Sequence, residues 1–539
     1  MKSVMVHSFA QIPDAKIPRS KFDRSHGYKT TFDAGYLVPV LVEEALPGDT
    51  FSLNMTTFSR LATPIVPFMD NMFLDSFFFA VPIRLIWDHW QAFNGEQTDP
   101  DSTTDYNIPQ MVAPASTGYA VGSLSDYFGL PTGVPGYSHS SLFHRAYNLI
   151  WNEWFRDQNL QDSVVVDKDD GTDDPADYVL LRRGKRHDYF TSCLPWPQKG
   201  PAVELPLGSK APVYGEPITA STNFNVFQGF NSTDSGVSNT YFQKTNSSAN
   251  VITGTLATKA INSFALGTSD DYDDWAGSAP PYADLSAATA ATINQLRQAF
   301  QVQRMYERDA RGGTRYTEII RSHFGVTSPD ARLQRPEYLG GGSSPINIHP
   351  VAQTSPTSMV SPQGNLAAFG TSNATNHGFT KSFVEHCLII GMVSARADLN
   401  YQQGLNRMFS RLTRFDFYWP TLSHLGEQAV LNKEIYMKGT NVDEDVFGYQ
   451  ERYAEYRYKP SVITGLFRST AAGTLDIWHL AQKFTDTPSL DDQFIQDNPP
   501  VDRVIAVPSQ PHFMFDAYFR MSAARPMPIY SVPGLIDHF

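Results

Sequence analysis

Three apolar segments near the two ends of the chain constrain the fold most, because each has the pattern of a β-strand. "DTFSLNMTTF" (49–58) alternates Phe51, Leu53 and Met55 with polar residues, the period of two of a half-buried strand. "FLDSFFFAVPIRLIW" (73–87) is apolar on both faces, which predicts a strand covered on both sides. "HFMFDAYFRM" (512–521) alternates again. Strands this far apart predict a sandwich or barrel closed by long-range pairing.

Composition agrees with many short strands joined by structured loops. The 37 prolines and 36 glycines are scattered along all 539 residues instead of being gathered in linkers. Aromatic residues make up 13% and charged residues only 18%, which predicts large surfaces that become buried against the chain itself or against partners.

Charge and cysteine content exclude several classes of protein. A net charge of −13 argues against a coat of nucleic acid over the whole surface, although local basic patches remain open. Cys193 and Cys387 are too few and too isolated for a disulfide scaffold or a zinc cage. The first residues lack an apolar core of signal-peptide length, and no uncharged stretch is long enough for a membrane helix, so we expect synthesis in a cytoplasm-like compartment and no membrane insertion.

Two segments have helical periodicity instead. In the helix predicted over 141–160, one apolar stripe contains the anchors Tyr147, Trp151, Trp154 and Phe155. In "ATINQLRQAFQVQRMYERDARGG" (291–313), arginines align along one ridge, and the two closing glycines should end the helix.

Candidate catalytic and metal sites are weak. Asn152–Glu153 is the dipeptide that many barrel glycosidases use as general acid, but here it falls within a helix between packing tryptophans. The acidic loop Asp167–Asp177 fails the calcium-loop spacing and reads as a solvated turn, and "EHC" (385–387) reads as a strand edge. We therefore predict no catalytic residue, no metal and no cofactor.

Basic residues interleaved with aromatics are candidates for single-stranded DNA contact, with cations on phosphates and rings under bases. For the stretches 182–186 and 407–414 the alternative is that the basic residues form salt bridges between subunits, and for the N-terminal arm it is an ordinary solvated tail. The candidates are Arg19, Lys21 and Arg24 in a basic N-terminal arm; Arg182, Arg183, Lys185 and Arg186; Arg297, Arg304, Arg308 and Arg311; and Arg407, Arg411 and Arg414.

The segment from Pro217 to Ser269 has only three charged residues, and Ser, Thr and Asn fill 24 of its 53 positions. Disorder is one interpretation. We favour an exposed insertion stabilised by neighbouring copies, since the segment keeps aromatic residues at intervals.

Four stretches resemble the major capsid protein of gokushoviruses, small single-stranded DNA phages of the Microviridae. They are "FDRSHGYKTTFDAGYLVPVLVEEALPGDTF", "RAYNLIWNEWFRDQNLQD", "RYTEIIRSHFGV" and "ARPMPIYSVPGLIDHF". The resemblance runs from about residue 20 to the C-terminus, except for about 208–283, a region that is hypervariable in this family.

The resemblance implies an eight-stranded antiparallel jelly roll of viral capsid type, mainly β, with long loop and helical insertions. It implies a T=1 icosahedral shell around circular single-stranded DNA, accompanied by a small basic DNA-binding virion protein and assembled in the host bacterial cytoplasm. The insertion would project near the three-fold axes and bind a host surface receptor. Its candidate attachment residues are Phe230, Asn231, Tyr241 and Phe242.

The expected organisation is an arm over 1–30, the first part of the jelly roll over 31–207, the variable insertion over 208–283, and the rest of the jelly roll over 284–539. Two alternatives stay open. One is a carbohydrate-active β-sandwich enzyme that uses Glu153 or the Asp167–Asp177 loop, and the other is a sugar-binding module in the insertion.

Overall fold

The computed structural model describes residues 18–97, 99–201, 203, 213–214, 282–283, 293–327, 334–359 and 362–530. The chain forms two compact units, one made of 1–201 with 305–539 and the other of 202–304. In the second unit, strand β8 (Val213–Tyr214) pairs antiparallel with β9 (Tyr282–Ala283), which brings the ends of the segment between them together. The candidate attachment residues Phe230, Asn231, Tyr241 and Phe242 lie outside the described residues.

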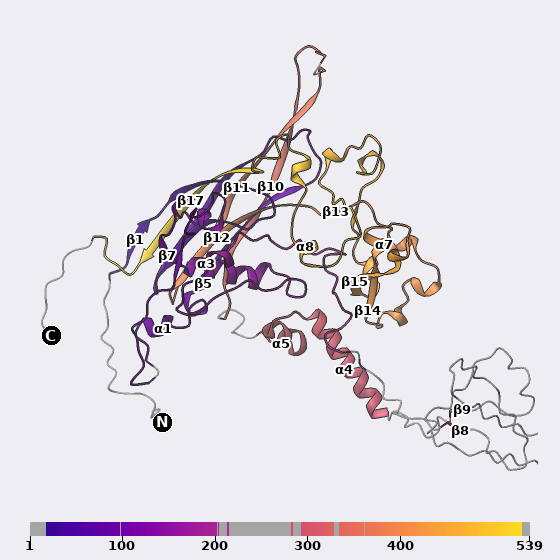
Figure 1. Cartoon of the computed structure of the whole chain (residues 1–539), viewed down its shortest axis with the longest axis horizontal. Coiled ribbons are helices and arrows are strands. Elements are labelled where there is room, and N and C mark those ends of the chain that lie inside the picture. The colour runs from indigo at the N-terminus through magenta and orange to yellow at the C-terminus, as the bar shows by residue number, and fades with distance from the viewer. Residues whose placement is uncertain are drawn as a thin grey trace, which may run out of the picture. The chain divides into compact units, whose positions relative to one another are not determined.

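The first unit is built on one large antiparallel sheet (Figure 1). Its strands are β1 (Ser20–Asp23), β2 (His26–Phe32), β3 (Val38–Ala45), β4 (Thr50–Leu61), β5 (Met72–Pro82), β10 (Glu337–Ala352), β11 (Leu366–Ser382), β12 (Cys387–Ala397) and β17 (Phe513–Arg525). Smaller strands are β6 (Gln110–Val112), β7 (Ser138–Ser140), β13 (Asn400–Tyr401), β14 (Glu427–Leu431), β15 (Val446–Glu451) and β16 (Ser461–Val462). The helices are α1 (Trp90–Phe93), α2 (Leu124–Tyr127), α3 (Leu142–Ile150), α4 (Ile293–Arg311, which runs across the boundary of the units), α5 (Tyr316–Phe324), α7 (Asn432–Ile435) and α8 (Asp492–Ile495).

The sheet is a long hairpin wrapped around a core. Strand β17 pairs with β1 and then with β2, so the nine strands occupy eight positions in the sheet, in the spatial order β1/β2, β17, β4, β11, β10, β5, β12 and β3. Counted along the chain instead, the eight are β1/β2, β3, β4, β5, β10, β11, β12 and β17. In this chain order the first pairs with the last, the second with the seventh, the third with the sixth and the fourth with the fifth. This nested pairing is the expected eight-stranded jelly roll, and its helices and long loops are inserted between strands.

The strand predictions made from hydrophobic periodicity are confirmed. In β4, buried and exposed residues alternate, with Phe51, Leu53 and Met55 facing the core. Strand β17 buries Phe513, Phe515, Ala517 and Phe519 in the same way, and nearly all of β5 is buried. Because β17 pairs with β2 and β4, residues from the two ends of the chain close one sheet.

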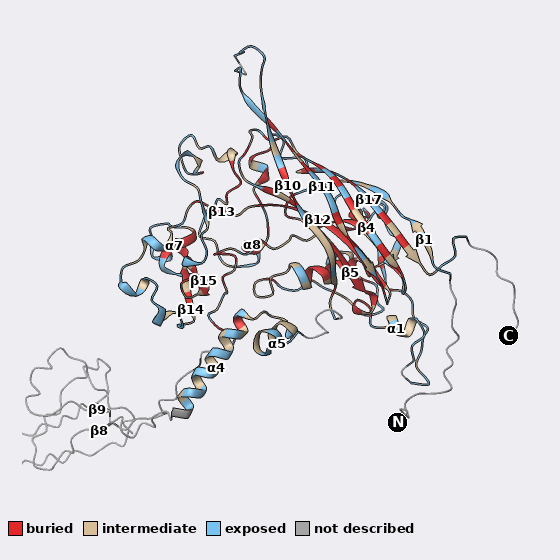
Figure 2. Cartoon of the chain, turned by 180° about the vertical axis from the view of Figure 1, so that it is seen from behind, coloured by how far each residue is buried: buried red, intermediate tan, exposed pale blue. Residues whose placement is uncertain are grey.

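Side chains link the two ends of the strand order. The carboxylate of Glu43 in β3 forms an ion pair of 2.7 Å with Arg24, the residue after β1, and a second one of 3.4 Å with Arg525 of β17. Tyr28 of β2 donates a hydrogen bond to the Pro39 carbonyl of β3 at 3.3 Å. The sheet is therefore curled enough to bring β3 beside β1 and β2 and to enclose an apolar core (Figure 2).

A helical layer covers the other face of β5 and β12. Phe79, Val81, Leu388 and Ile390 point into a second core that contains α2 and α3. The helix predicted over 141–160 is shorter: α3 passes into a π-helical turn at Trp151–Phe155 and ends there. Burial on both faces explains why β5 reads as a continuous apolar run.

Most of the acidic loop Asp167–Asp177 is exposed, as its composition predicts, but two of its aspartates contact the interior. Asp173 is buried and binds the guanidinium of Arg145, which is fully buried, through two contacts of 2.5 and 2.7 Å. Asp170 accepts a hydrogen bond from the indole nitrogen of Trp87 at 2.6 Å. The loop is therefore a structural element that fastens α3 to the segment after β5.

The N-terminal arm predicted over 1–30 is also shorter. Residues Ser20–Asp23 and His26–Phe32 form β1 and β2, because they continue the pairing of β17 along its free edge. Residues 1–17 lie outside the described part of the chain. Within that described part, no helix combines the length and the apolar character needed to cross a membrane.

Candidate nucleic-acid interface

A third apolar cluster forms a lobe between β12 and β17 in sequence, built from β14, β15 and α7 together with the segment 189–193 (Figure 1). Its floor is aromatic: Tyr189, Phe190 and Tyr401 are buried, and the Phe190 and Tyr401 rings meet edge to face at 4.8 Å. Hydrogen bonds hold these aromatic residues in place. Tyr401 donates a hydrogen bond to Asp188 at 2.7 Å, and Gln450 donates one to the Tyr189 carbonyl at 2.9 Å.

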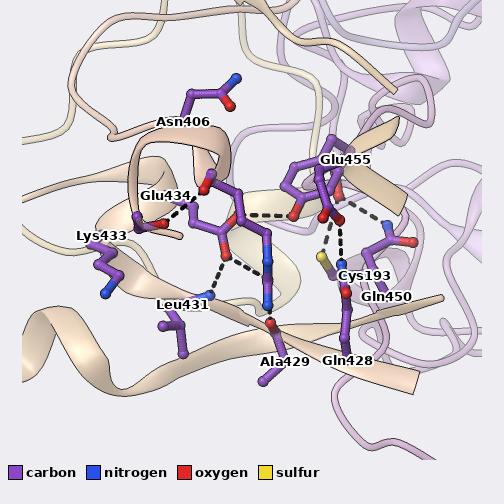
Figure 3. Close-up of polar contacts among 12 residues, drawn as sticks. Cys193, Asn406, Gln428, Ala429, Leu431, Lys433, Glu434, Gln450 and Glu455 are labelled. Carbon is purple, nitrogen blue, oxygen red and sulfur yellow. Dashed lines mark hydrogen bonds and ion pairs between the residues drawn. The ribbon is translucent and has the colours of Figure 1, made fainter. Parts of the chain in front are cut away.

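Glu434 is the centre of the polar contacts in this lobe (Figure 3). Its carboxylate accepts hydrogen bonds from the Tyr189 hydroxyl at 2.8 Å, from Arg407 at 2.9 Å and from the Leu431 backbone at 3.0 Å. Burial raises the pKa of Glu434, and the Arg407 guanidinium opposes that rise. Arg407, a predicted DNA contact, is thus mainly engaged inside the subunit.

A cavity of about 360 Å³ opens above this floor. Five basic residues line it, Arg407, Arg411, Arg457, Lys459 and Arg468, together with only two carboxylates, those of Glu434 and Glu455. Its aromatic lining adds Tyr456 and Tyr458, which are exposed. The cavity is therefore positively charged and lined by rings, a combination suited to a planar group that carries a negative charge.

Beside the cavity, the segment 409–419 exposes a set of rings, which we call the aromatic ledge: Phe409, Phe415, Phe417, Tyr418 and Trp419. Four of the five are about half exposed, at 49–54%, and Phe409 is 70% exposed. Arginines lie over the rings: Arg411 is 4.9 Å from the centre of Phe417, and Arg414 is 4.9 Å from that of Phe415. Clustered exposed rings of this kind mark an interaction surface.

A local turn holds the ledge in place. Asp416 accepts backbone hydrogen bonds from Thr413 at 2.7 Å and Leu412 at 2.9 Å, and these bonds lower its pKa. On the other side, Arg452 and Tyr453 donate to the Phe415 carbonyl at 3.3 and 3.4 Å. Since Tyr453 is buried in the left-handed conformation (φ 63°), the backbone is strained to make this support. The rings are thus displayed from an ordered loop.

The basic segment 182–186 has a different placement. Arg182 donates to the Ala34 and Asp497 carbonyls, Arg183 pairs with Asp75 at 2.7 Å, and the buried Lys185 donates to the Phe494 carbonyl at 2.5 Å. Only Arg186 is exposed. Three of these four candidates therefore have internal partners, which favours a structural role for them.

The side chains of Arg182, Arg183 and Lys185 surround the buried carboxyl of Asp497, and this carboxyl should make the stability of the fold depend on pH. Burial raises the pKa of Asp497 to about 6, against the pull of Arg183 and Lys185. A carboxyl whose pKa is higher in the folded chain holds its proton more tightly there, so the fold loses stability as pH rises from about 4 to about 6. We expect Asp497→Asn to remove this loss and to stabilise the subunit at pH 7 by up to about 3 kcal/mol, with little effect at pH 3.5. Urea unfolding at both pH values measures it, and an equal effect at both would contradict it.

The remaining basic candidates are spread over the first unit and α4. Arg19 and Lys21 are exposed at β1, and Arg24 pairs with Glu43. Arg297, Arg304, Arg308 and Arg311 are all exposed on α4, and Arg311 is ion-paired with Glu427 of β14. β1 and the β14–β15 lobe lie on opposite sides of the first unit (Figure 1), so the structure does not gather the candidates into one site.

The aromatic anchors of α3 and of the π-helical turn that follows it hold this segment to the sheet. The Tyr147 hydroxyl donates to the Leu37 carbonyl at 2.8 Å, and the Trp151 indole donates to the Arg182 carbonyl at 2.8 Å. Trp154 is less buried than the stripe predicts, at 37% exposed, but its ring lies 5.4 Å from that of Phe79, and the ring of Phe155 meets Phe79 edge to face at 5.9 Å. Glu153, which lies between Trp151 and Trp154 in the sequence, pairs with Arg315 at 2.8 Å and so connects the π-helical turn to the start of α5.

Comparison with known proteins decides the family. The family model described as "Capsid protein (F protein)" matches residues 10–535. This chain belongs to that family. It is 50% identical to the capsid protein VP1 of Bdellovibrio phage phiMH2K over 539 residues, covering 99% of this chain and 98% of that relative. It is 48% identical to VP1 of Chlamydia phage 1 over 588 residues and 37% identical to VP1 of Spiroplasma virus 4 over 553 residues, each match covering at least 98% of both chains.

Membership in a capsid family implies self-association into a shell and a place in the virion. The gokushovirus-type resemblance stated from sequence motifs is therefore confirmed at the level of microvirus capsid proteins. Sequence reasoning found the arginines of 407–414 but missed the cavity beside them. The signal was present in "EYRYKP" (455–460), which alternates rings and cations 41 residues beyond Arg414; only folding brings the two segments together.

Proposed function

We propose that this capsid protein assembles into a T=1 icosahedral shell around circular single-stranded DNA and acts as a structural protein without catalytic activity. The observation that carries the proposal is the wrapped eight-position sheet of a chain that matches a capsid family along 10–535. Glu153 is used in the ion pair with Arg315, and Asp173 in the buried pair with Arg145, so the two sites considered for an enzyme have structural uses.

The aromatic ledge and its neighbouring cavity support the DNA part of the proposal. Single-stranded nucleic acid is bound by stacking bases on rings and placing phosphates near cations, and the ledge offers both kinds of group from an ordered loop. Further phosphate contacts come from exposed basic residues that face the genome, with Arg19, Lys21, Arg186, Arg308 and Arg414 as the candidates.

Net charge supports a second virion component. A chain of −13 repels DNA overall, so we propose that a small basic DNA-binding protein neutralises most of the genome and that the ledge supplies local contacts. We also propose that the variable insertion over 208–283 carries host attachment, with Phe230, Asn231, Tyr241 and Phe242 as its first candidates. Assembly in the host bacterial cytoplasm completes the proposal.

The test is sedimentation of native material followed by electron microscopy of the fast fraction. We expect megadalton particles of icosahedral symmetry that protect single-stranded DNA from nuclease. A species that stays near the 60.1 kDa of one chain, with no nucleic acid under any assembly condition, would contradict the proposal.

A further inference from the structure

Strands β10 and β11 continue beyond the sheet as a two-stranded ribbon. Their register pairs Asn347–Ala352 with Leu366–Thr371. The other neighbour of β10 is β5, which pairs only with Glu337–Ile346, and the other neighbour of β11 is β4, which pairs only with Gly370–Ser382. Within the described chain, 347–352 and 366–369 thus have no strand partner on their outer edges, and the ribbon projects from the first unit (Figures 1 and 2).

One face of the ribbon is apolar and exposed. Cross-strand partners share a face, so His349 and Val351 lie beside Phe369 and Ala367. All four are exposed, with Val351 at 47% and Phe369 at 40%. The rings of His349 and Phe369 stack at 5.0 Å, which holds Phe369 across the face.

The ribbon also has no charge. Residues 338–380 contain no Asp, Glu, Lys or Arg, although the whole chain carries 97 such residues, 42 basic and 55 acidic. Exposed edge strands are normally protected against pairing with other chains by charged side chains or proline, and here Pro350 is the one such feature in β10 beyond Asn347. An isolated two-stranded hairpin is also marginally stable in water.

We propose that this ribbon docks on a neighbouring copy of the same chain and buries the face formed by His349, Val351, Ala367 and Phe369. This inference rests on the proposed shell, and it names one contact that the shell uses. The identity of the partner that covers the ribbon follows from the charge of the surface. Copies that each carry −13 repel one another, so a contact between them is most favourable where the surface has no charge. DNA does not fit the ribbon, because a surface without cations gives phosphates no partner.

The experiment compares two variants that add the same charge. Val351→Asp with Phe369→Asp places two carboxylates on the exposed face of the ribbon. Thr56→Asp with Asn373→Asp places two on exposed positions of β4 and β11 within the sheet. We expect the ribbon variant to fold as the wild type does, judged by circular dichroism and thermal unfolding. Its yield of particles, measured by sedimentation, should be lower than that of the wild type by a factor of at least about ten. The sheet variant should assemble nearly as the wild type does.

Hydrogen exchange gives a readout that does not depend on substitution. Amides of 347–352 and 366–369 on the free edges should exchange rapidly in the unassembled subunit and become protected in particles. Wild-type yields from the ribbon variant, together with unchanged exchange on assembly, would overturn the inference and leave the shell proposal standing. Absence of particles from the wild type would instead refute the shell itself.

Discussion

Replacing Arg145 by alanine is expected to lower the free energy of unfolding by about 3–5 kcal/mol, because it leaves a buried carboxylate without its partner. Arg145 is fully buried, and its guanidinium makes two contacts with Asp173, whose side chain is only 1% exposed. A third nitrogen donates to the backbone carbonyls of Ile86 and Asp169 at 3.2 and 3.0 Å. One substitution thus removes the fastening between α3, the segment after β5 and the acidic loop.

Urea unfolding of the unassembled subunit, followed by tryptophan fluorescence, measures this loss. Trp87 and Trp151 report on it directly, since both belong to the second core, which contains α3. The matched control is Lys29→Ala, which breaks an ion pair of similar length with Asp516, at 2.9 Å, but with both partners exposed. We expect the control to cost below about 1 kcal/mol.

A double replacement separates burial from pairing. Arg145→Met with Asp173→Asn removes both charges, so no buried carboxylate is left unpaired, and we expect it to recover a substantial part of the stability lost in Arg145→Ala. A loss below about 1 kcal/mol for Arg145→Ala itself would show that Asp173 is hydrated in solution.

Removing rings and cations from the aromatic ledge is expected to weaken single-stranded DNA binding in two distinguishable ways. Trp419→Ala removes a stacking surface worth about 1–3 kcal/mol, so the affinity for an oligothymidylate should fall roughly 5- to 150-fold with an unchanged salt dependence. Arg414→Ala removes a cation, so it should reduce the slope of log affinity against log salt by about 0.7 for one lost phosphate contact.

Fluorescence anisotropy with the full-length unassembled subunit, over a range of salt concentrations, measures both effects. The control is Tyr518→Ala, because Tyr518 is a ring of similar exposure, 53%, on β17 and outside the ledge. If the ledge instead contacts a neighbouring copy, Trp419→Ala will block particle formation and leave oligonucleotide affinity unchanged. That result would reject the ledge as a DNA surface.

The sequence was most informative where burial repeats with the period of one element. Alternation in β4 and β17 follows from one face meeting the core and the other meeting water, and the run of apolar residues in β5 follows from cores on both faces. The helix α4 ends at Arg311, directly before the predicted glycines. Motif resemblance supplied the topology, since pairing of the chain's two ends cannot be specified by local periodicity.

Tertiary structure alone decided what each polar residue does. Arg183 and Arg414 look alike in sequence, because each belongs to a stretch that mixes basic and aromatic residues. Arg183 nevertheless pairs with Asp75, whereas Arg414 is exposed and lies over the ring of Phe415. Asp173 looked solvated because five other aspartates surround it, and it is buried because Arg145 reaches it from α3. A charge is committed to the interior or left for a partner by what lies opposite it after folding, and that neighbour is usually far away along the chain.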